Sequence, residues 1–452
     1  MTFLLDIATN IVFFFMEYFK IFMEYLFISP FSFFKELTFG ELVVFFLPAI
    51  CIDIPRYVMS DLIVFLKETF FPDNYRDTDF ADLLYGPNQP LLSVLLPGYN
   101  EEESVGKTID SFLESSYKNI EIIAVSDGSN DRMNEVCQGY AMQGKIRYFV
   151  HHERCGKSAA ANYALKMAKG DFIIIADADT TYDYDALHQI MLPFADPEVG
   201  GVSANLRVRN WRKNYFTKLQ GLEYIFSIGM GRRFSSMFGF ISIVSGAFGA
   251  FKKEVLLEVG GWEPGPGEDA DITVKIRKTG CKIVFAPKSM CMTDVPDNPK
   301  SYWKQRLRWN RSLIRLRVRK HNDVYFRWHD YKFGTVFGMV DSVFFQLFMP
   351  IIRIPYYLMV GFYFTERGYL VVAGTIYFYT LTNFFKFTIA LALSERKRED
   401  IFLIPLLPFF TFFKLFETFD RLWACFDEFV FETSFTDPYV PTRVLNQAKR
   451  KW

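Results

Sequence analysis

The stretch DFIIIADADT, residues 171–180, decides the fold class of this chain. Its aliphatic run predicts a buried strand over Asp171–Ala176, and two aspartates follow the strand directly. Similar short runs lie upstream, separated by helical patterns near 102–115, 131–143 and 157–168; they are Leu91–Leu96, Ile120–Ser126 and Ile146–Val150. Strands that alternate with helices in this way indicate an α/β domain with a mostly parallel sheet.

Polar residues follow three of these four predicted strands. They are Tyr99, Asn100 and Glu101 after the first strand, Asp127 after the second, and Asp177 and Asp179 after the fourth. Parallel sheets bind ligands beyond the carboxyl ends of their strands. One aspartate in such a place is usually a turn former or a helix cap, but three such strand ends indicate a binding site. The spacing Asp177-x-Asp179 is a hard-oxygen pair that suits Mg²⁺ or Mn²⁺ on a diphosphate.

The overall composition narrows the class of protein. The 452 residues include 52 Phe, and 51 basic residues balance 51 acidic ones, with a mean hydropathy of +0.09. These values exclude global disorder and argue against a nucleic-acid binder that relies on overall basic charge. The six Cys form no CxxC pair, which excludes a disulfide framework or a zinc ribbon.

The apolar residues gather near the two ends of the chain. Glu41–Leu66, Phe333–Phe364 and Tyr369–Ser394 are long enough to span a bilayer, and the last, with Lys386 as its one charge, is predicted to be the strongest span. A further segment, Ile11–Phe27, carries three charges on one helical face. It is either a span whose polar face packs in a bundle or an interfacial helix.

The distribution of basic residues predicts the orientation. The Glu395–Asp400 loop and the Lys449–Lys451 tail are basic, so both are expected on the cytoplasmic side of a plasma membrane. The segment Ile401–Phe431 then starts and ends inside, which favours a re-entrant or interfacial helix, or a short hairpin. The α/β domain is expected to be cytoplasmic.

Two further motifs lie downstream: the acidic pair Glu268-Asp269 and the stretch Gln305-Arg306-Leu307-Arg308-Trp309. Together with Asp127 and Asp177-Ala178-Asp179, the series resembles the inverting family 2 glycosyltransferases with a GT-A fold. It is most similar to their processive membrane synthases of cellulose, hyaluronan, chitin and poly-N-acetylglucosamine. The likeness covers about residues 91–325. A DxD alone is common, whereas the ordered set with QxxRW is specific.

The resemblance implies roles for the donor-side residues. Asp127 would bind the uracil ring, Asp179 would hold the metal on the diphosphate, and Asp177 would support that site. Lys157 lies in a stretch that looks like the family's GK-x-x-A-x-N segment and would face the anionic nucleotide; the alternative is a solvated lysine at a helix start. Tyr99 and Glu101 are expected among the donor-binding residues.

The resemblance also implies the acceptor side. Asp269 would be the general base that takes the proton from the acceptor hydroxyl, so that one direct displacement inverts the anomeric configuration. Glu268 would be its hydrogen-bonding neighbour, Gly267 stands where the family has Thr, and Asp271 is expected to be a helix-surface acid. The segment Ser245–Phe251 is either an acceptor-side segment or a tightly packed strand or turn.

Gln305, Arg308 and Trp309 share one helical face, where the Arg can neutralise a diphosphate and the Trp can stack on a sugar. Basic and apolar residues alternate around them from Trp303 to Lys320. This pattern predicts a basic amphipathic helix on the membrane surface. Nucleic-acid binding is the competing interpretation, and the flanking spans argue against it.

Asp341, Gln346, Arg353 and Lys386 are costly in lipid. They either line a glycan channel or form internal ion pairs, such as Asp341 with Lys386 or Arg353. His151-His152 with Glu153 invites a metal-site interpretation, but adjacent side chains on a strand point in opposite directions.

These features predict six regions: N-terminal membrane helices (1–68), a linker (69–90), a GT-A domain (91–298), an interface helix with QxxRW (299–332), a C-terminal membrane region (333–432) and a cytoplasmic tail (433–452). The predicted function is processive polymerisation of a UDP-sugar, UDP-GlcNAc or UDP-glucose, with translocation of the growing glycan. The alternatives are single transfer to a lipid, as in ceramide glucosyltransferase, and a transporter with a decayed synthase domain. The expected partners are the UDP-sugar, the glycan acceptor and the bilayer, and a separate regulatory or export subunit is compatible with the chain.

Overall fold

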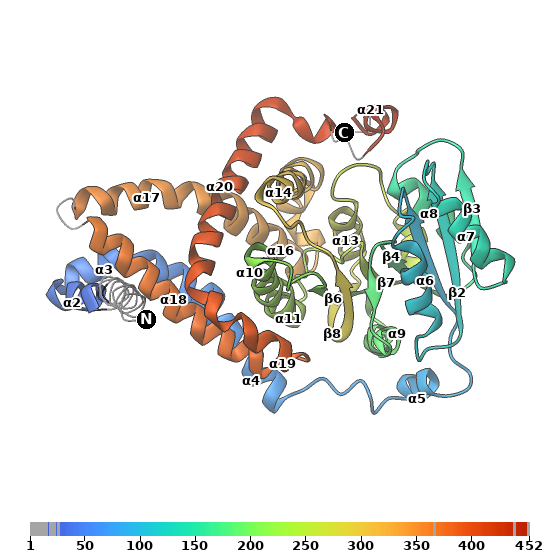
Figure 1. Ribbon diagram of the computed structural model, residues 1–452, viewed down its shortest axis with the longest axis horizontal. Helices are drawn as coiled ribbons and strands as arrows, with labels where there is room; N and C mark the ends of the chain where they lie inside the picture. Colours follow the sequence, from blue (N-terminus) through green and yellow to red (C-terminus); the bar gives the residue numbers. More distant parts are fainter. Residues whose placement is uncertain (1–16, 18–23, 25–27, 365–367, 437–439, 450–452) are drawn as a thin grey trace, which may run out of the picture. The chain divides into compact units, whose positions relative to one another are not determined.

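The computed structural model describes residues 17, 24, 28–364, 368–436 and 440–449 (Figure 1). The chain forms two compact units. One comprises Met1–Leu62 with Ile351–Phe416, and the other comprises Ile63–Pro350 with Glu417–Trp452. Most of the predicted segment Ile11–Phe27 lies outside the described residues.

The second unit is built on an eight-stranded sheet in the order β3-β2-β1-β4-β7-β6-β8-β5. The strands are β1 (Leu92–Gly98), β2 (Ile120–Asp127), β3 (Arg147–His151), β4 (Phe172–Ala176), β5 (Thr181–Tyr182), β6 (Val199–Val208), β7 (Phe248–Lys252) and β8 (Lys282–Thr293). The first four pair in parallel, as predicted. Strand β7 then runs antiparallel to both β4 and β6, so the other half of the sheet is mixed.

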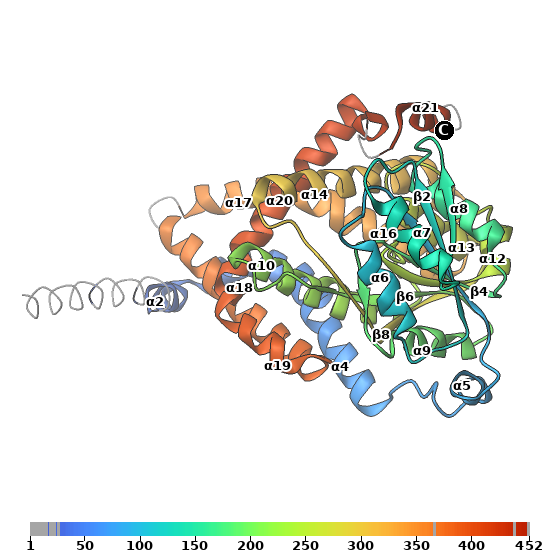
Figure 2. The ribbon, with the colours of Figure 1, turned by 45° about the vertical axis from the view of Figure 1, so that its right-hand side comes forward.

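The second unit also contains helices α5 to α16, several of which cover the two faces of this sheet. They are α5 (Asp79–Tyr85), α6 (Val105–Leu113), α7 (Met133–Met142), α8 (Lys157–Met167), α9 (Ala186–Met191), α10 (Tyr215–Tyr224), α11 (Gly231–Met237), α12 (Lys253–Glu258), α13 (Glu268–Lys278), α14 (Pro299–Leu313), α15 (Asp323–Phe326) and α16 (Phe333–Val343). Helices α6 and α7, side by side in Figure 2, pack on one face together with α9. Helices α8, α12 and α13 pack on the other face.

The alternation of side chains along the central strands builds these two cores. In β1, Val94 and Leu96 belong to the core under α6, whereas Leu95 belongs to the core under α8. Both faces of the strands are buried, which explains their nearly continuous aliphatic sequences. Because β1, β2 and β4 run in parallel, the residues after Gly98, Asp127 and Ala176 meet at one edge of the sheet.

Further helices, several of them long and apolar, are found toward both ends of the chain. They are α2 (Ser29–Glu36), α3 (Phe39–Pro48), the π-helical stretch Ala49–Met59, α4 (Ser60–Phe70), α17 (Met349–Tyr363), α18 (Gly368–Ala392), α19 (Lys397–Asp400) and α20 (Leu407–Phe431), with a short α21 (Thr442–Lys449) after them. Within the described residues, three continuous helical stretches are long and apolar enough to cross a membrane: Phe39–Phe70, Phe333–Tyr363 and Lys397–Phe431.

Helix α18 is long enough to span a bilayer but is not among these three, so its composition does not support the prediction that Tyr369–Ser394 is the strongest span, which stays a prediction. The Tyr and Thr residues of α18, together with Asn383 and Lys386, lower the mean hydropathy of this helix. The third stretch contains the segment that was expected to be re-entrant or interfacial. How many of these helices cross the membrane, and in which direction, stays a prediction.

Charged side chains inside the first unit pair with acids of its N-terminal helices. Arg353 of α17 pairs with Asp53, whose other oxygen accepts a hydrogen bond from Tyr379 at 2.5 Å. Lys386 of α18 lies 4.0 Å from Asp61. These contacts support internal ion pairs rather than channel-lining charges, but Asp53 and Asp61 supply the acids where Asp341 was expected.

Replacing Asp53 by alanine is expected to destabilise the protein by about 3–5 kcal/mol, because Arg353 would keep an uncompensated buried charge. Thermal unfolding of the purified protein in detergent measures the loss. The double variant Asp53→Leu with Arg353→Met removes both charges and is expected to recover most of the stability. A double variant as unstable as the single one would show that the pair is not the cause.

Candidate functional site

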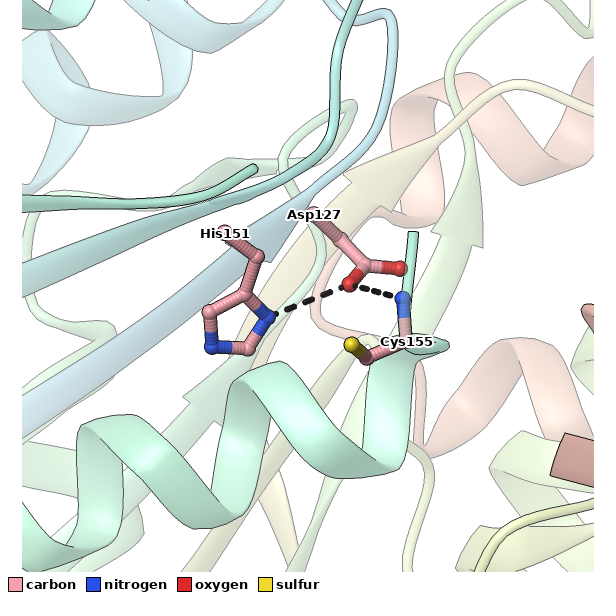
Figure 3. Close-up of side chains that lie close together, drawn as sticks. All are labelled: Asp127, His151 and Cys155. Carbon is pink, nitrogen blue, oxygen red and sulfur yellow. Dashed lines mark hydrogen bonds and ion pairs between the residues drawn. The ribbon is translucent and has the colours of Figure 1, made fainter. Parts of the chain in front are cut away.

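Asp127, at the end of β2, holds the loop that leads into α8. Its Oδ1 accepts the Cys155 N–H at 2.8 Å and its Oδ2 accepts the Gly156 N–H at 2.7 Å. His151 Nδ1 lies 3.3 Å from Oδ1, so the carboxylate sits between the ring and the loop (Figure 3). Asp127 is only 3% exposed. The structure therefore gives it a loop-anchoring role that the sequence did not predict.

Asp127, His151 and Cys155 also offer three metal-ligand atoms within 4.8 Å of one another. Two observations argue against a resident cation here. The Asp127 oxygens already accept the loop amides, and an Arg443 guanidinium nitrogen lies 3.4 Å from the Cys155 sulfur. A cation would therefore be placed beside a fixed positive charge.

Arg443, in α21, connects the C-terminal tail to this same loop. It pairs with Glu153 and donates a hydrogen bond to the Arg154 carbonyl at 3.2 Å. The Arg154 guanidinium in turn lies 4.0 Å from the centre of the Tyr99 ring. The sequence analysis missed the tail, because no local pattern connects residues that are 290 positions apart.

Lys157, the first residue of α8, is the centre of an acidic cluster. Its ammonium pairs with Asp177 and lies 3.8 Å from Glu268 Oε1. Burial alone would lower the pKa of Lys157, but the carboxylates of Asp177, Glu268 and Asp269 outweigh burial and hold the pKa above its ordinary value. A solvated lysine at a helix start does not describe these contacts. Lys157 joins the DxD to the acidic pair.

The DxD and Glu101 gather negative charge at the sheet edge. Burial raises the pKa of Asp179, and the nearby Asp177 carboxylate raises it further. Burial likewise raises the pKa of Glu101, with added repulsion from Asp179 and Asp177. Partly buried carboxylates that repel one another gain from a divalent cation, and oxygen is the donor that Mg²⁺ and Mn²⁺ prefer. The residues present therefore fit such an ion.

The acidic pair Glu268-Asp269 begins α13. Two glycines, Gly246 and Gly267, allow other residues to pack closely around this pair. A Cβ on Gly246 would lie 2.9 Å from the Lys157 ammonium and 3.9 Å from the Asp269 Cβ, so the small residue lets both groups approach. Gly267, directly before the pair, has φ 82° in the left-handed region. A Cβ there would lie 2.7 Å from the Ser312 Cβ. The glycine at the position where the family has Thr is thus required by this backbone.

Replacing Gly267 by alanine is expected to cost about 1–2 kcal/mol of stability from the left-handed φ alone, and more from the clash with Ser312. Because the change moves the first turn of α13, sugar transfer should fall as well. Thermal unfolding and transfer rates measure the two effects. Gly144→Ala is the matched control, since Gly144 also has a positive φ (67°) but no atom within 4 Å of its added Cβ.

The QxxRW residues lie on α14. Trp309 is 39% exposed, and the Arg306 guanidinium lies 4.4 Å from the centre of its ring. The Arg308 charge acts on Glu268, where it opposes the rise in pKa that burial causes. In the structure, Arg308 is thus the QxxRW member whose charge reaches the acidic pair.

The basic residues around this motif do not form a free basic face. Their partners in the second unit are Glu223 for Arg306, Asp427 for Arg311, the Pro264 carbonyl for Arg315, the Ser242 carbonyl for Arg317, Glu428 for Arg319, and Glu263 and Asp271 for Lys320. Most of the basic residues of this stretch are thus paired within the protein, whereas Lys304 is exposed, and the placement of the helix on the membrane surface stays a prediction. Periodicity could not reveal acids from distant helices.

Asp271 is a correction to the sequence analysis. It was expected on the helix surface, but it is 2% exposed and its Oδ1 lies 2.7 Å from Lys320 and 2.8 Å from His321. Two further residues were missed near the DxD. Arg209 donates to the Asp179 carbonyl at 3.1 Å, and the buried Tyr182 hydroxyl donates to the Ala247 carbonyl at 2.8 Å. A two-residue strand such as β5 carries no pattern that would predict Tyr182.

Comparisons with known proteins agree with this geometry. The chain is 34% identical over 220 residues to the poly-β-1,6-N-acetyl-D-glucosamine synthase of Staphylococcus aureus (strain COL), which is 48% of this chain and 53% of that protein. It is 30% identical over 321 residues to the synthase of the same name from Staphylococcus epidermidis, covering 68% of this chain and 75% of that protein. The chain thus spans about half the length of the Staphylococcus aureus relatives that it matches.

A mannosyltransferase from Pyrobaculum calidifontis, solved in complex with GDP-Man and Mn²⁺, has a similar structure. Its TM-score is 0.55 at 19% identity, over 85% of this chain and 98% of that one. This likeness shows the fold, a GT-A-like sheet flanked here by apolar helices. A family profile described as "Glycosyltransferase like family 2" matches residues 87–312, which is half of the chain and contains every predicted site residue. The chain therefore belongs to glycosyltransferase family 2.

Proposed function

We propose that this protein is an inverting, processive glycosyltransferase that polymerises a UDP-sugar at the cytoplasmic face of a membrane and translocates the product. The observation that carries the proposal is the cluster of Lys157, Asp177 and Glu268 at the sheet edge, with Asp269 beside it. It brings Lys157, the DxD aspartate Asp177 and the acidic pair together from three distant parts of the sequence, which supports their proposed roles at the donor, the metal and the acceptor.

In this proposal, each group has one task. Asp269 accepts the proton from the acceptor hydroxyl as that oxygen attacks the anomeric carbon. Lys157 faces the negative charge of the donor, and its ammonium contacts Asp177 and lies 3.8 Å from Glu268. Asp127 orders the loop that borders the uracil, Tyr99 with Arg154 borders the same region, and Trp309 offers a face for a sugar ring.

Asp179, supported by Asp177 and with Glu101 nearby, would hold Mg²⁺ or Mn²⁺. When bound, such an ion supplies positive charge that stabilises the leaving diphosphate. The raised pKa values of Asp179 and Glu101 and their mutual repulsion support this assignment. The DxD aspartates would thus be neutralised by a cation on one side and by Lys157 on the other.

UDP-GlcNAc is the first candidate donor, because the relatives described above are named for a polymer of N-acetylglucosamine. UDP-glucose is the second. The three apolar helical stretches support a membrane location. The growing glycan is the proposed acceptor, and a regulatory or export subunit is a further candidate partner.

The experiment that tests this function supplies the purified full-length protein with labelled UDP-sugars and measures the size of the product. A long polysaccharide made from UDP-GlcNAc or UDP-glucose is the expected result. A lipid carrying a single labelled sugar would replace the proposal with single transfer. No transfer from any UDP-sugar, by a protein that is folded and supplied with Mn²⁺, would refute it.

A further inference from the structure

A closed network of charged side chains lies directly behind the acidic pair. Glu263 stands at the start of the loop before the pair, Asp271 and Lys275 lie on α13, and Lys320 and His321 end the helical stretch that began as α14. Lys275 and Lys320 contact Glu263 at 2.6 and 2.7 Å. Lys320 and His321 contact Asp271 at 2.7 and 2.8 Å, with Lys275 at 3.6 Å.

The centre of the network is buried, whereas the Glu263 side chain at its edge is 33% exposed. Asp271 and His321 are 2% and 4% exposed. Burial opposes ionisation of Asp271, but the hydrogen bond from His321 and the charges of Lys320 and Lys275 outweigh it and hold the pKa far below its ordinary value. Burial lowers the pKa of His321, so the neutral ring donates its Nε2–H to Asp271 at neutral pH. A buried charge in such a network is costly to leave unpaired.

The network spans a loop in which prolines and glycines alternate. Between Glu263 and Glu268 the sequence is Pro-Gly-Pro-Gly, and Gly265 and Gly267 have φ values of 124° and 82°. Glu263 fixes the loop before these glycines. Asp271 fixes it after them, and its N–H donates to the Gly267 carbonyl at 3.0 Å. Asp269 lies between Gly267 and Asp271, so its place depends on both anchors.

The other half of the network belongs to the helix that carries QxxRW. The extension of α14 over Ile314–Lys320 ends in Lys320, followed by His321. The same helix supplies Arg315, which donates to the Pro264 carbonyl at 3.2 Å. The four charged groups and the His321 ring therefore tie the loop of the proposed general base to the helix of Gln305, Arg308 and Trp309.

We propose that Asp271, with His321 and Lys320, is a positioning residue for sugar transfer: it fixes Asp269 relative to the QxxRW helix. This inference rests on the proposed function, because it assigns Asp269 as the base. The network touches neither donor nor acceptor groups in this assignment. Its loss should affect the chemical step and spare donor binding, since small misplacements of a reacting group are enough to slow a reaction about 100-fold.

The test uses the full-length protein and compares kcat with the KM for the UDP-sugar. Asp271→Asn is expected to lower kcat about 10- to 100-fold with a KM within about twofold of wild type. His321→Leu, which removes the Nε2 donor, should lower kcat in the same way. His321→Gln places an amide N–H where the ring N–H was, and it should recover most of the activity.

Asp323→Asn is the matched control. Asp323 pairs with Lys278 at 2.7 Å, on the same helix α13 but at the end away from the acidic pair. The Asp323→Asn variant should keep the wild-type kcat, even where its melting temperature falls as much as that of Asp271→Asn. If Asp271→Asn does not fold, the positioning role is tested by comparing the kcat of His321→Gln with that of His321→Leu.

Equal kcat losses in Asp271→Asn and Asp323→Asn, or a higher KM at unchanged kcat, would overturn the positioning role. So would a His321→Gln variant as slow as His321→Leu. These results differ from a failure of the proposed function, in which the wild-type protein itself transfers no sugar from any UDP donor.

Discussion

Replacing Asp269 by asparagine is expected to lower sugar transfer by about 100- to 10,000-fold while UDP binding stays nearly unchanged. The amide has almost the same shape as the carboxylate but cannot accept the proton from the acceptor hydroxyl. Asp269 is beside Gly246 and Lys157 rather than among the loop amides that surround Asp127, so nucleotide binding should not depend on its charge. Single-turnover transfer and calorimetric titration with UDP measure the two quantities.

Substitution of Glu268, the other acid of the pair, tests which of the two residues is the general base. Glu268 lies 3.8 Å from Lys157, so Glu268→Gln changes the charge balance of the cluster without removing the base. We expect it to retain more activity than Asp269→Asn. Full activity in Asp269→Asn, or a larger loss in Glu268→Gln, would move the base assignment away from Asp269.

Removing divalent cations with EDTA is expected to stop transfer, and Mn²⁺ or Mg²⁺ should restore it. The stabilisation of a leaving diphosphate is worth several kcal/mol, so the loss should exceed about 100-fold. The structural reason is the set of carboxylates at the sheet edge, where Asp177 and Asp179 repel one another and, of these two aspartates, Asp177 is the one that forms an ion pair with Lys157. Activity assays across a metal titration measure the effect.

Asp179→Asn provides the residue-level form of the same test. It should shift the Mn²⁺ dependence to much higher concentration, whereas Asp183→Asn, a nearby aspartate outside the DxD, should leave it unchanged. Turnover that survives EDTA at the wild-type rate would exclude the metal site. An unchanged Mn²⁺ dependence in Asp179→Asn would assign the metal to other ligands.

The central strands and their order of motifs could be predicted because both depend on local sequence. Aliphatic runs of five to eight residues, separated by helical patterns, are visible without any tertiary contact, and β1 to β4 lie where they were expected. The residues that meet beyond the ends of parallel strands are also predictable, because parallel strands place their carboxyl ends at one edge of the sheet. This is why the DxD and Asp127 were identified from the sequence.

Charge partners could not be predicted in the same way. Lys157 pairs with Asp177 twenty positions away, Lys320 with Glu263 at fifty-seven and Arg443 with Glu153 at 290. Helical periodicity assigned Asp271 and the basic residues near QxxRW to a surface because it describes one helix alone. Whether a charged face meets solvent, lipid or another helix depends on packing between distant segments.

The sequence by itself determined the α/β domain between two apolar regions, the family and the residue types of the site, since these follow from local pattern and ordered motifs. Only the tertiary structure decided what each charged group touches. It placed Lys157 between the DxD and the acidic pair, made Gly267 a requirement of the backbone, and buried Asp271 against Lys320 and His321. The physical reason is that electrostatic energy depends on distance and burial, and neither is encoded at any fixed spacing along the chain.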